Sequence, residues 1–103
     1  MSGFVLHPDA LDDLDEIWTF IALDNVAAAD RVIQEINDAI RAVLPFPQIG
    51  HSRPDLTSRP IRFLSVRDLL IAYAPDESPL LVHAILDGRR NPRVIAAFLR
   101  ARK

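Results

Sequence analysis

Apolar residues in the first half of the chain recur every three or four positions in two successive stretches. The first stretch follows Pro8 and the second follows Asn25, with only a few residues between them. This spacing predicts two amphipathic helices, and the short link predicts that they form an antiparallel hairpin. Pro8 fits the first position of a helix, and Asn25 is a good N-cap residue. The predicted apolar stripes are Leu11, Leu14, Ile17, Trp18 and Ile21 in the first helix, and Ala29, Ile33, Ile36, Ile40 and Val43 in the second.

The second half of the chain changes to short apolar runs, which are typical of strands. Residues 62–66, 69–74 and 80–86 are joined by short, turn-like links and therefore predict an antiparallel meander. Residues 4–7 form a further extended run, residues 45–60 form a proline-rich ordered loop, and Pro92 can open a last helix. The order β-αα-βββ-α predicts a single α+β domain, residues 1–103, in which the helical hairpin packs on a small antiparallel sheet.

The composition narrows the chemistry that this domain can perform. The 103 residues include no cysteine, which excludes disulfides and thiolate metal sites. His7, His51 and His83 lack metal-ligand spacing and no glycine-rich phosphate loop is present, so we expect no metal and no cofactor. No apolar run is long enough to span a membrane, and the start of the chain lacks the features of a signal peptide. We therefore expect a cytoplasmic protein.

Charge is divided unevenly along the chain. Residues 1–49 carry nine acidic residues and two arginines, whereas residues 50–103 carry five acidic residues, nine arginines and one lysine. The basic half indicates a face for an anionic partner, with a solvated polar surface as the alternative. The acidic cluster of the first predicted helix lies off its apolar stripe, so we expect most of it on the solvated outer face; it consists of Asp12, Asp13, Asp15 and Glu16.

Two kinds of function are consistent with the arginines of the basic half. Arg53, Arg62 and Arg90 come from a loop, a strand and a turn, and such positions can converge to hold a phosphate. An enzyme that cleaves RNA also needs a general acid or base, for which His51 and Tyr73 are the candidates. Alternatively, the arginines dock an acidic partner without catalysis, because a planar guanidinium suits bidentate contacts.

Six segments, spread over nearly the whole chain, carry a resemblance to a known family. In order they are ALDDLDEIWTFIA, AAADRVIQEINDAI, LPFPQIGHSRPDL, RPIRFLSV, LLIAYAP and LVHAILDGRRNP. Together they resemble the RelE/ParE superfamily of type II toxin–antitoxin toxins, on the ParE side. In such toxins the last strand usually ends in a His-Gly-x-Arg-Asp-like sequence. Gly88 and Arg90 match that sequence here, whereas Asp87 and Asn91 depart from it.

The resemblance implies a growth-inhibiting toxin with one of two actions. RelE-like members cleave messenger RNA on the ribosome, whereas ParE-like members trap DNA gyrase on broken DNA. This chain has one lysine, a net charge of −2 and no tyrosine or histidine in residues 98–103. Neutralisation of phosphates dominates binding to RNA, so these features favour the ParE-like action.

A ParE-like toxin implies a non-enzymatic protein whose partners are a cognate antitoxin and DNA gyrase. We expect Arg89, Arg90 and Arg93 to bind the target. We expect the antitoxin to bind as a partly disordered segment that folds on the toxin, which gives a hetero-oligomer. The toxin alone is expected to bind neither nucleic acid nor membranes. Two alternatives remain open: a messenger RNA endoribonuclease that uses Arg53, Arg62, Arg90, His51 and Tyr73, and an inactive protein with the toxin fold, since Asp87 and Asn91 depart from the motif.

Overall fold

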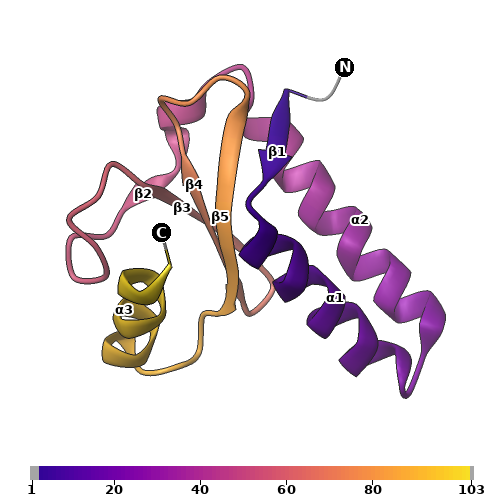
Figure 1. Ribbon diagram of the computed structural model, residues 1–103. Helices are drawn as coiled ribbons and strands as arrows, with labels where there is room; N and C mark the ends of the chain where they lie inside the picture. Colours follow the sequence, from indigo (N-terminus) through magenta and orange to yellow (C-terminus); the bar gives the residue numbers. More distant parts are fainter. Residues whose placement is uncertain (1–2, 103) are drawn as a thin grey trace.

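The computed structural model describes residues 3–102, and its elements follow the predicted order (Figure 1). A three-residue strand precedes a helical hairpin, a loop leads into a meander of three strands, and a helix closes the chain. The elements are β1 (Phe4–Leu6), α1 (Pro8–Ala22), α2 (Val26–Val43), the 3₁₀ turn η1 (Pro47–Ile49), β2 (His51–Ser52), β3 (Arg62–Val66), β4 (Leu69–Ala74), β5 (Leu80–Asp87) and α3 (Pro92–Ala101). The α+β prediction is confirmed.

The strands of residues 3–102 form one sheet in the order β1-β5-β4-β3-β2. The β3–β4–β5 meander is antiparallel, as predicted. The sheet as a whole is mixed rather than antiparallel, because β1 pairs with residues 80–82 of β5 in the parallel direction. No tight turn dictates the direction of β1, since both hairpin helices and the rest of the meander separate it from β5 in the chain.

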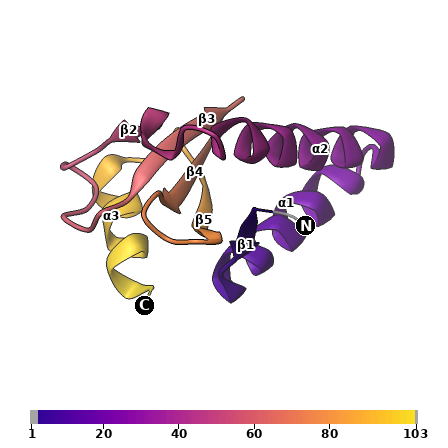
Figure 2. The same ribbon diagram turned by 90° about the horizontal axis from the view of Figure 1, so that it is seen from above.

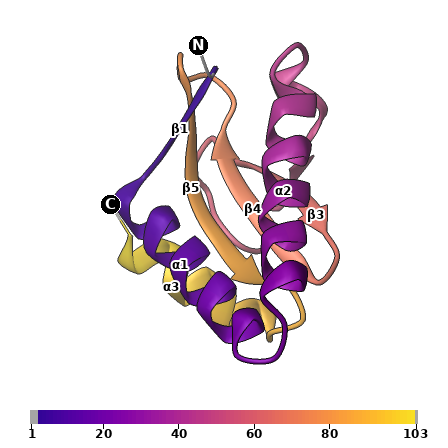
Figure 3. The same ribbon diagram turned by 90° about the vertical axis from the view of Figure 1, so that its right-hand side faces the viewer.

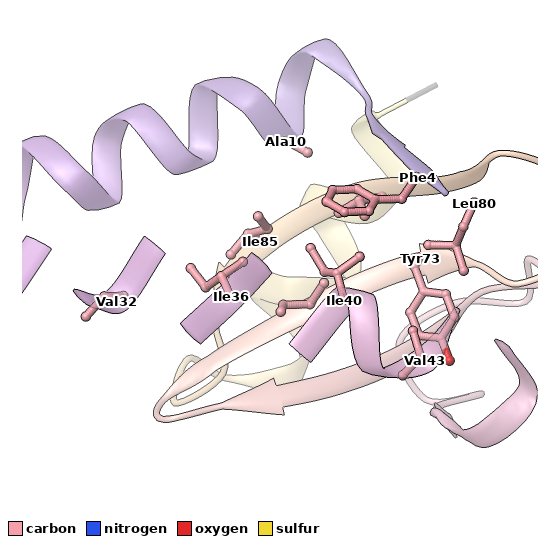
Figure 4. Close-up of a cluster of buried hydrophobic side chains, with 11 residues drawn as sticks. Phe4, Ala10, Val32, Ile36, Ile40, Val43, Tyr73, Leu80 and Ile85 are labelled. Atoms are coloured by element: carbon pink, nitrogen blue, oxygen red, sulfur yellow. The ribbon is translucent and has the colours of Figure 1, made fainter. Parts of the chain in front are cut away.

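Helices cover both faces of the sheet. The α1–α2 hairpin lies on one side and α3 lies on the other (Figure 2). Ile36 and Ile40 of α2 pack with Ile71 and Val82 in the larger apolar cluster, which Figure 4 shows from within. The smaller cluster lies under α3 and consists of Leu56, Ile61, Phe63, Leu70, Ala72, Ala84, Ile95 and Leu99.

An extra residue in β5 changes which side chains face each helix layer. Ala72 pairs with Ala84 and Tyr73 pairs with Val82, so His83 is a bulge. Val82 therefore belongs to the hairpin-side cluster, and Ile85, three residues later, belongs to it as well. The bulge turns the end of β5 so that the backbone N–H of Ile85 points toward α1.

The local signals at the helix starts are confirmed. Pro8 is the first residue of α1, and the side chain of Asn25 accepts a hydrogen bond from the backbone N–H of Ala28. His7, at the N-cap of α1, accepts a hydrogen bond from the N–H of Asp9 through its Nδ1 atom. Capping of this kind satisfies backbone donors that have no partner within the helix.

The predicted face of α1 is correct in part. Leu14, Ile17 and Ile21 pack against the larger cluster, as predicted. Leu11 and Trp18 are exposed instead, and Ala10 and Asp13 are buried. The Asp13 carboxylate accepts hydrogen bonds from the N–H of Ile85 (2.9 Å) and from both terminal nitrogens of Arg102 (2.6 and 2.7 Å). The sequence pattern placed Asp13 off the buried stripe because it is charged. Its burial is possible because Arg102 balances that charge and Ile85 supplies a further donor.

We predict that the Asp13–Arg102 ion pair is a major source of stability. Arg102→Ala leaves the carboxylate largely buried without its cation, so the free energy of unfolding is expected to fall by about 3–5 kcal/mol. A double-mutant cycle with Asp13→Ala, measured by urea unfolding, gives the coupling between the two side chains. The exposed pair Arg67–Glu35 provides the matched control cycle, and its coupling is expected to be smaller. Equal coupling in the two cycles would contradict the prediction.

Candidate target-binding surface and groove

The turn between β5 and α3 is ordered by the two residues that depart from the toxin motif. The Asp87 carboxylate accepts hydrogen bonds from the backbone N–H of Arg89 (3.0 Å) and from its guanidinium (3.1 and 3.2 Å). These bonds lower the pKa of Asp87. Asn91 accepts a hydrogen bond from the N–H of Arg93 (2.8 Å) and so caps α3. Both departures therefore have a structural role in this chain.

The three arginines predicted to bind the target differ in their availability. Arg89 is engaged with Asp87 and lies 3.6 Å from a carboxylate oxygen of Asp68. The guanidinium of Arg90 lies over the ring of Phe98, 5.9 Å from its centroid. Within residues 3–102, neither Arg90 nor Arg93 forms an ion pair with an acidic side chain. These two side chains are therefore exposed and open to an acidic or phosphate-bearing partner.

The acidic residues of this turn and of the buried face of α1 pair with arginines other than Arg90. Asp87 forms an ion pair with Arg89, and the buried Asp13 of α1 forms one with Arg102. Arg90 instead contacts the ring of Phe98.

Three of the five residues proposed for a ribonuclease, Tyr73, Arg62 and Arg53, already have partners in the structure. The Tyr73 hydroxyl is buried, donates a hydrogen bond to the carbonyl of Pro47 (2.5 Å) and accepts one from the N–H of Gly50 (3.0 Å). Burial raises the pKa of Tyr73. Arg62 donates to the carbonyl of Gly50 (3.1 Å), and Arg53 forms an ion pair with Asp55.

The structure does not bring the five ribonuclease candidates together. In the register of β3 and β4, Arg62 lies opposite Tyr73 near one end of the sheet. His51 is exposed on the neighbouring strand β2. Arg90 follows Asp87, which pairs with Leu69 at the opposite end. Val82 of β5 lies opposite Tyr73, and Asp87 lies five residues further along the same strand. At about 3.3 Å per residue, the two ends are about 16 Å apart. Arg90 therefore does not share one phosphate site with Arg62 and His51.

A groove of about 800 Å³ lies between α1 and α3, and the sequence pattern did not predict it. Its lining includes Ile85 and Leu86 of β5, Ile17 and Phe20 of α1, and Phe98 of α3. Arg67 and Asp68, between β3 and β4, line it as well. Figure 3 shows the C-terminal end of α3 close to the first turns of α1. The Asp13–Arg102 pair spans the groove at that end. The signal that was missed is Asp13, a charged residue that shares the buried face of α1 with Ala10.

Comparison with known proteins places the chain in a family. Residues 4–92 match the family described as "ParE toxin of type II toxin-antitoxin system, parDE". The chain therefore belongs to the ParE toxin family. It is also 38% identical over 66 residues to a protein of Sinorhizobium fredii named "Putative toxin Y4kP". That alignment covers 64% of this chain and 60% of the relative, so it spans less than two thirds of the relative's length.

Within residues 3–102, no group of three or more acidic or histidine side chains is arranged to hold a metal ion. No helix in that range is long and apolar enough to cross a membrane.

We predict that Tyr73 stabilises the loop that precedes β2 rather than transferring protons. Tyr73→Phe removes the partner of the Gly50 N–H and the Pro47 carbonyl, which is expected to lower the free energy of unfolding by about 1–3 kcal/mol. Gly50→Ala tests the same contact from the other side, because an added Cβ would collide with the Tyr73 ring and hydroxyl. Gly3→Ala is the matched control, since its Cβ would meet only the flexible end of Leu44. Unchanged stability in Tyr73→Phe would refute this role.

Two histidine side chains meet at the junction of β1, α1 and β5. The rings of His7 and His83 are stacked, with centroids 6.0 Å apart. Burial lowers the pKa of His83 below its usual 6.5, the charges of Arg59 and His7 lower it further, and Glu77 opposes them. The unfolded chain therefore takes up this proton more readily than the folded chain. Stability contributed by neutral His83 is complete above pH 6.5 and is lost as the pH falls below that value.

We expect the urea midpoint to fall between pH 7.5 and pH 5.5, and His83→Gln to reduce that fall. His51→Gln is the control, because His51 is exposed on β2. A pH dependence that is the same in both variants would show that His83 is not responsible.

Proposed function

We propose that this chain is a ParE-type toxin that inhibits growth by binding DNA gyrase, without catalysis of its own, and that a cognate antitoxin neutralises it. Membership of the ParE toxin family supports the toxin part of this proposal. The observation that carries the target-binding part is the contrast between two groups of polar side chains. Arg90 and Arg93 are exposed and unpaired by acidic side chains within residues 3–102, whereas Arg62 and Tyr73 are engaged with Gly50.

The engaged groups argue against an endoribonuclease. A general acid or base must reach the proton that it transfers, within hydrogen-bond distance of the substrate. The Tyr73 hydroxyl is buried and already makes two hydrogen bonds, and its raised pKa disfavours the phenolate at neutral pH. His51 is exposed, but Arg90 lies at the other end of the sheet and cannot act with it on one phosphate.

Exposed aromatic side chains support the proposed antitoxin partner. Phe4 and Phe63 belong to the core, but Phe46 is 70% exposed, Phe20 is 77% exposed and Phe98 is 43% exposed. Phe20 and Phe98 line the groove between α1 and α3. An antitoxin segment that orders as it binds would cover such surface and gain from its burial.

The proposal predicts that Arg90 and Arg93 are needed for toxicity but not for folding. The double variant Arg90→Ala/Arg93→Ala is expected to inhibit supercoiling by purified gyrase at least about tenfold less, because charged anchors carry much of the energy of an interface. In cells, wild-type expression is expected to induce the DNA-damage response while messenger RNA stays intact. Arg100→Ala is the matched control, since Arg100 is exposed on the same helix.

Three results would contradict the proposal. One is full gyrase inhibition by a folded Arg90→Ala/Arg93→Ala variant. Another is equal loss in Arg100→Ala, which would indicate a general effect of positive charge. The third is site-specific cleavage of messenger RNA that disappears in a folded Arg62→Ala variant, which would support the endoribonuclease.

A further inference from the structure

Arg89 lies between two carboxylates at the turn that follows β5. The Asp87 carboxylate accepts hydrogen bonds from Nε of Arg89 (3.1 Å) and from one of its terminal nitrogens (3.2 Å). The other terminal nitrogen lies 3.6 Å from a carboxylate oxygen of Asp68, in the turn between β3 and β4. One guanidinium therefore balances two acidic side chains that come from different turns.

Arg90 shares this surface without pairing with either carboxylate. Its guanidinium lies over the Phe98 ring, 5.9 Å from the centroid. The hydrogen bonds from Arg89 are the main cause that lowers the pKa of Asp87, and the charge of Arg90 is a smaller one, so Asp87 lies within electrostatic reach of Arg90. An exposed cation–π contact and an exposed ion pair are of similar strength. Arg90 therefore stays on Phe98 because Asp87 is already occupied.

The backbone of the turn favours Arg89 as the partner of Asp87. The Asp87 side chain also accepts a hydrogen bond from the backbone N–H of Arg89 (3.0 Å), as in an Asx turn. This bond fixes Arg89 beside the carboxylate, so its side chain loses less freedom when it forms the ion pair. The backbone N–H of Arg90 donates instead to the carbonyl of Asp87 (3.3 Å).

We propose that Arg89 is a positioning residue for target binding, which occupies the two neighbouring carboxylates and so keeps the Arg90 guanidinium available to an acidic or phosphate-bearing partner. Arg89 itself does not contact the target. Without Arg89, the carboxylates of Asp68 and Asp87 are left bare beside Arg90, where they attract its guanidinium and repel an anionic surface. The inference rests on the proposed function, in which Arg90 and Arg93 bind gyrase.

The test is whether Asp87→Asn restores what Arg89→Ala removes. Arg89→Ala is expected to inhibit purified gyrase about threefold to fivefold less, a factor that one exposed ion pair can supply. Most of the inhibition is expected to return in Arg89→Ala/Asp87→Asn, although that variant still lacks the arginine. The asparagine oxygen can accept the backbone N–H of residue 89 as the carboxylate does, so the turn keeps its shape.

Arg100→Ala is the matched control for the loss of one positive charge, since Arg100 is exposed on α3 and forms no ion pair within residues 3–102. Asp87→Asn is expected to give Arg100→Ala no comparable recovery, because Arg89 still balances the carboxylates in that variant. Double-mutant cycles of Asp87 with each arginine measure the difference. Asp68→Asn is expected to restore less than Asp87→Asn, since Asp68 lies farther from Arg89.

A second readout does not involve gyrase. Phenylglyoxal modifies arginine side chains, and mass spectrometry of proteolytic fragments gives the rate at Arg90. The reagent attacks the neutral guanidine, and a neighbouring carboxylate favours the charged form. The rate at Arg90 is therefore expected to fall about twofold to threefold in Arg89→Ala and to return in Arg89→Ala/Asp87→Asn. Circular dichroism and urea midpoints establish that each variant is folded.

Four results would overturn the inference. They are full gyrase inhibition by Arg89→Ala, a loss that Asp87→Asn does not restore, equal recovery in the Arg89 and Arg100 cycles, and an unchanged rate at Arg90 in Arg89→Ala. The second would show that Arg89 contacts the target, and the third would show a general effect of charge. If the wild-type protein does not inhibit gyrase, the proposed function fails, and the rate at Arg90 still decides the inference.

Discussion

Beyond Val82, β5 has no neighbouring strand on its outer side, because β1 pairs only with residues 80–82. The backbone N–H of Ile85 therefore has no strand partner, and the Asp13 carboxylate accepts its hydrogen bond instead. Arg102 balances the charge of that carboxylate. The pair links α1, which covers one face of the sheet, to the end of α3, which covers the other. If either partner is lost, the other is left as a largely buried charge without its counter-ion, at a cost larger than that of a surface pair. One edge of one strand thus links the two helical layers.

The groove is a consequence of where that link lies. The Asp13–Arg102 pair joins α1 to α3 at one end only, and no hydrogen bond or ion pair within residues 3–102 joins the last turn of α1 to α3. The remaining length is lined by apolar side chains that no part of the described chain covers fully, such as Phe20. The apolar surface that stays exposed in the groove is therefore separate from the ion pair that links the two helices.

Local signals predicted most of the fold, and long-range pairs account for what they missed. Pro8 and Asn25 mark helix starts through chemistry within three residues, so the sequence locates them well. The burial of Asp13 depends on Arg102, which is 89 residues away, and periodicity assigned the charged residue to water. The bulge at His83 was equally invisible, since it depends on the register with β4. For the site, exposure of Arg90 followed from its place in a turn, whereas the engagement of Arg62 and Tyr73 depends on how the proline-rich loop folds back over them.

The fate of the arginines explains how a chain with a basic half presents only a small free cationic surface. Arg59 donates to the carbonyls of Leu99 and Arg102 and so closes the C-terminal end of α3, and Arg62 holds the backbone of Gly50. Others are balanced one by one by acidic side chains, in the pairs Arg53–Asp55, Arg67–Glu35, Arg89–Asp87 and Arg102–Asp13. A guanidinium whose N–H groups already donate to a carboxylate or a carbonyl has fewer donors available for a phosphate. The charge of the second half therefore overstates its capacity to bind an extended anion such as RNA. Within residues 3–102, Arg90, Arg93 and Arg100 are the arginines of this half that are exposed and form neither an ion pair with an acidic side chain nor a hydrogen bond to a backbone carbonyl.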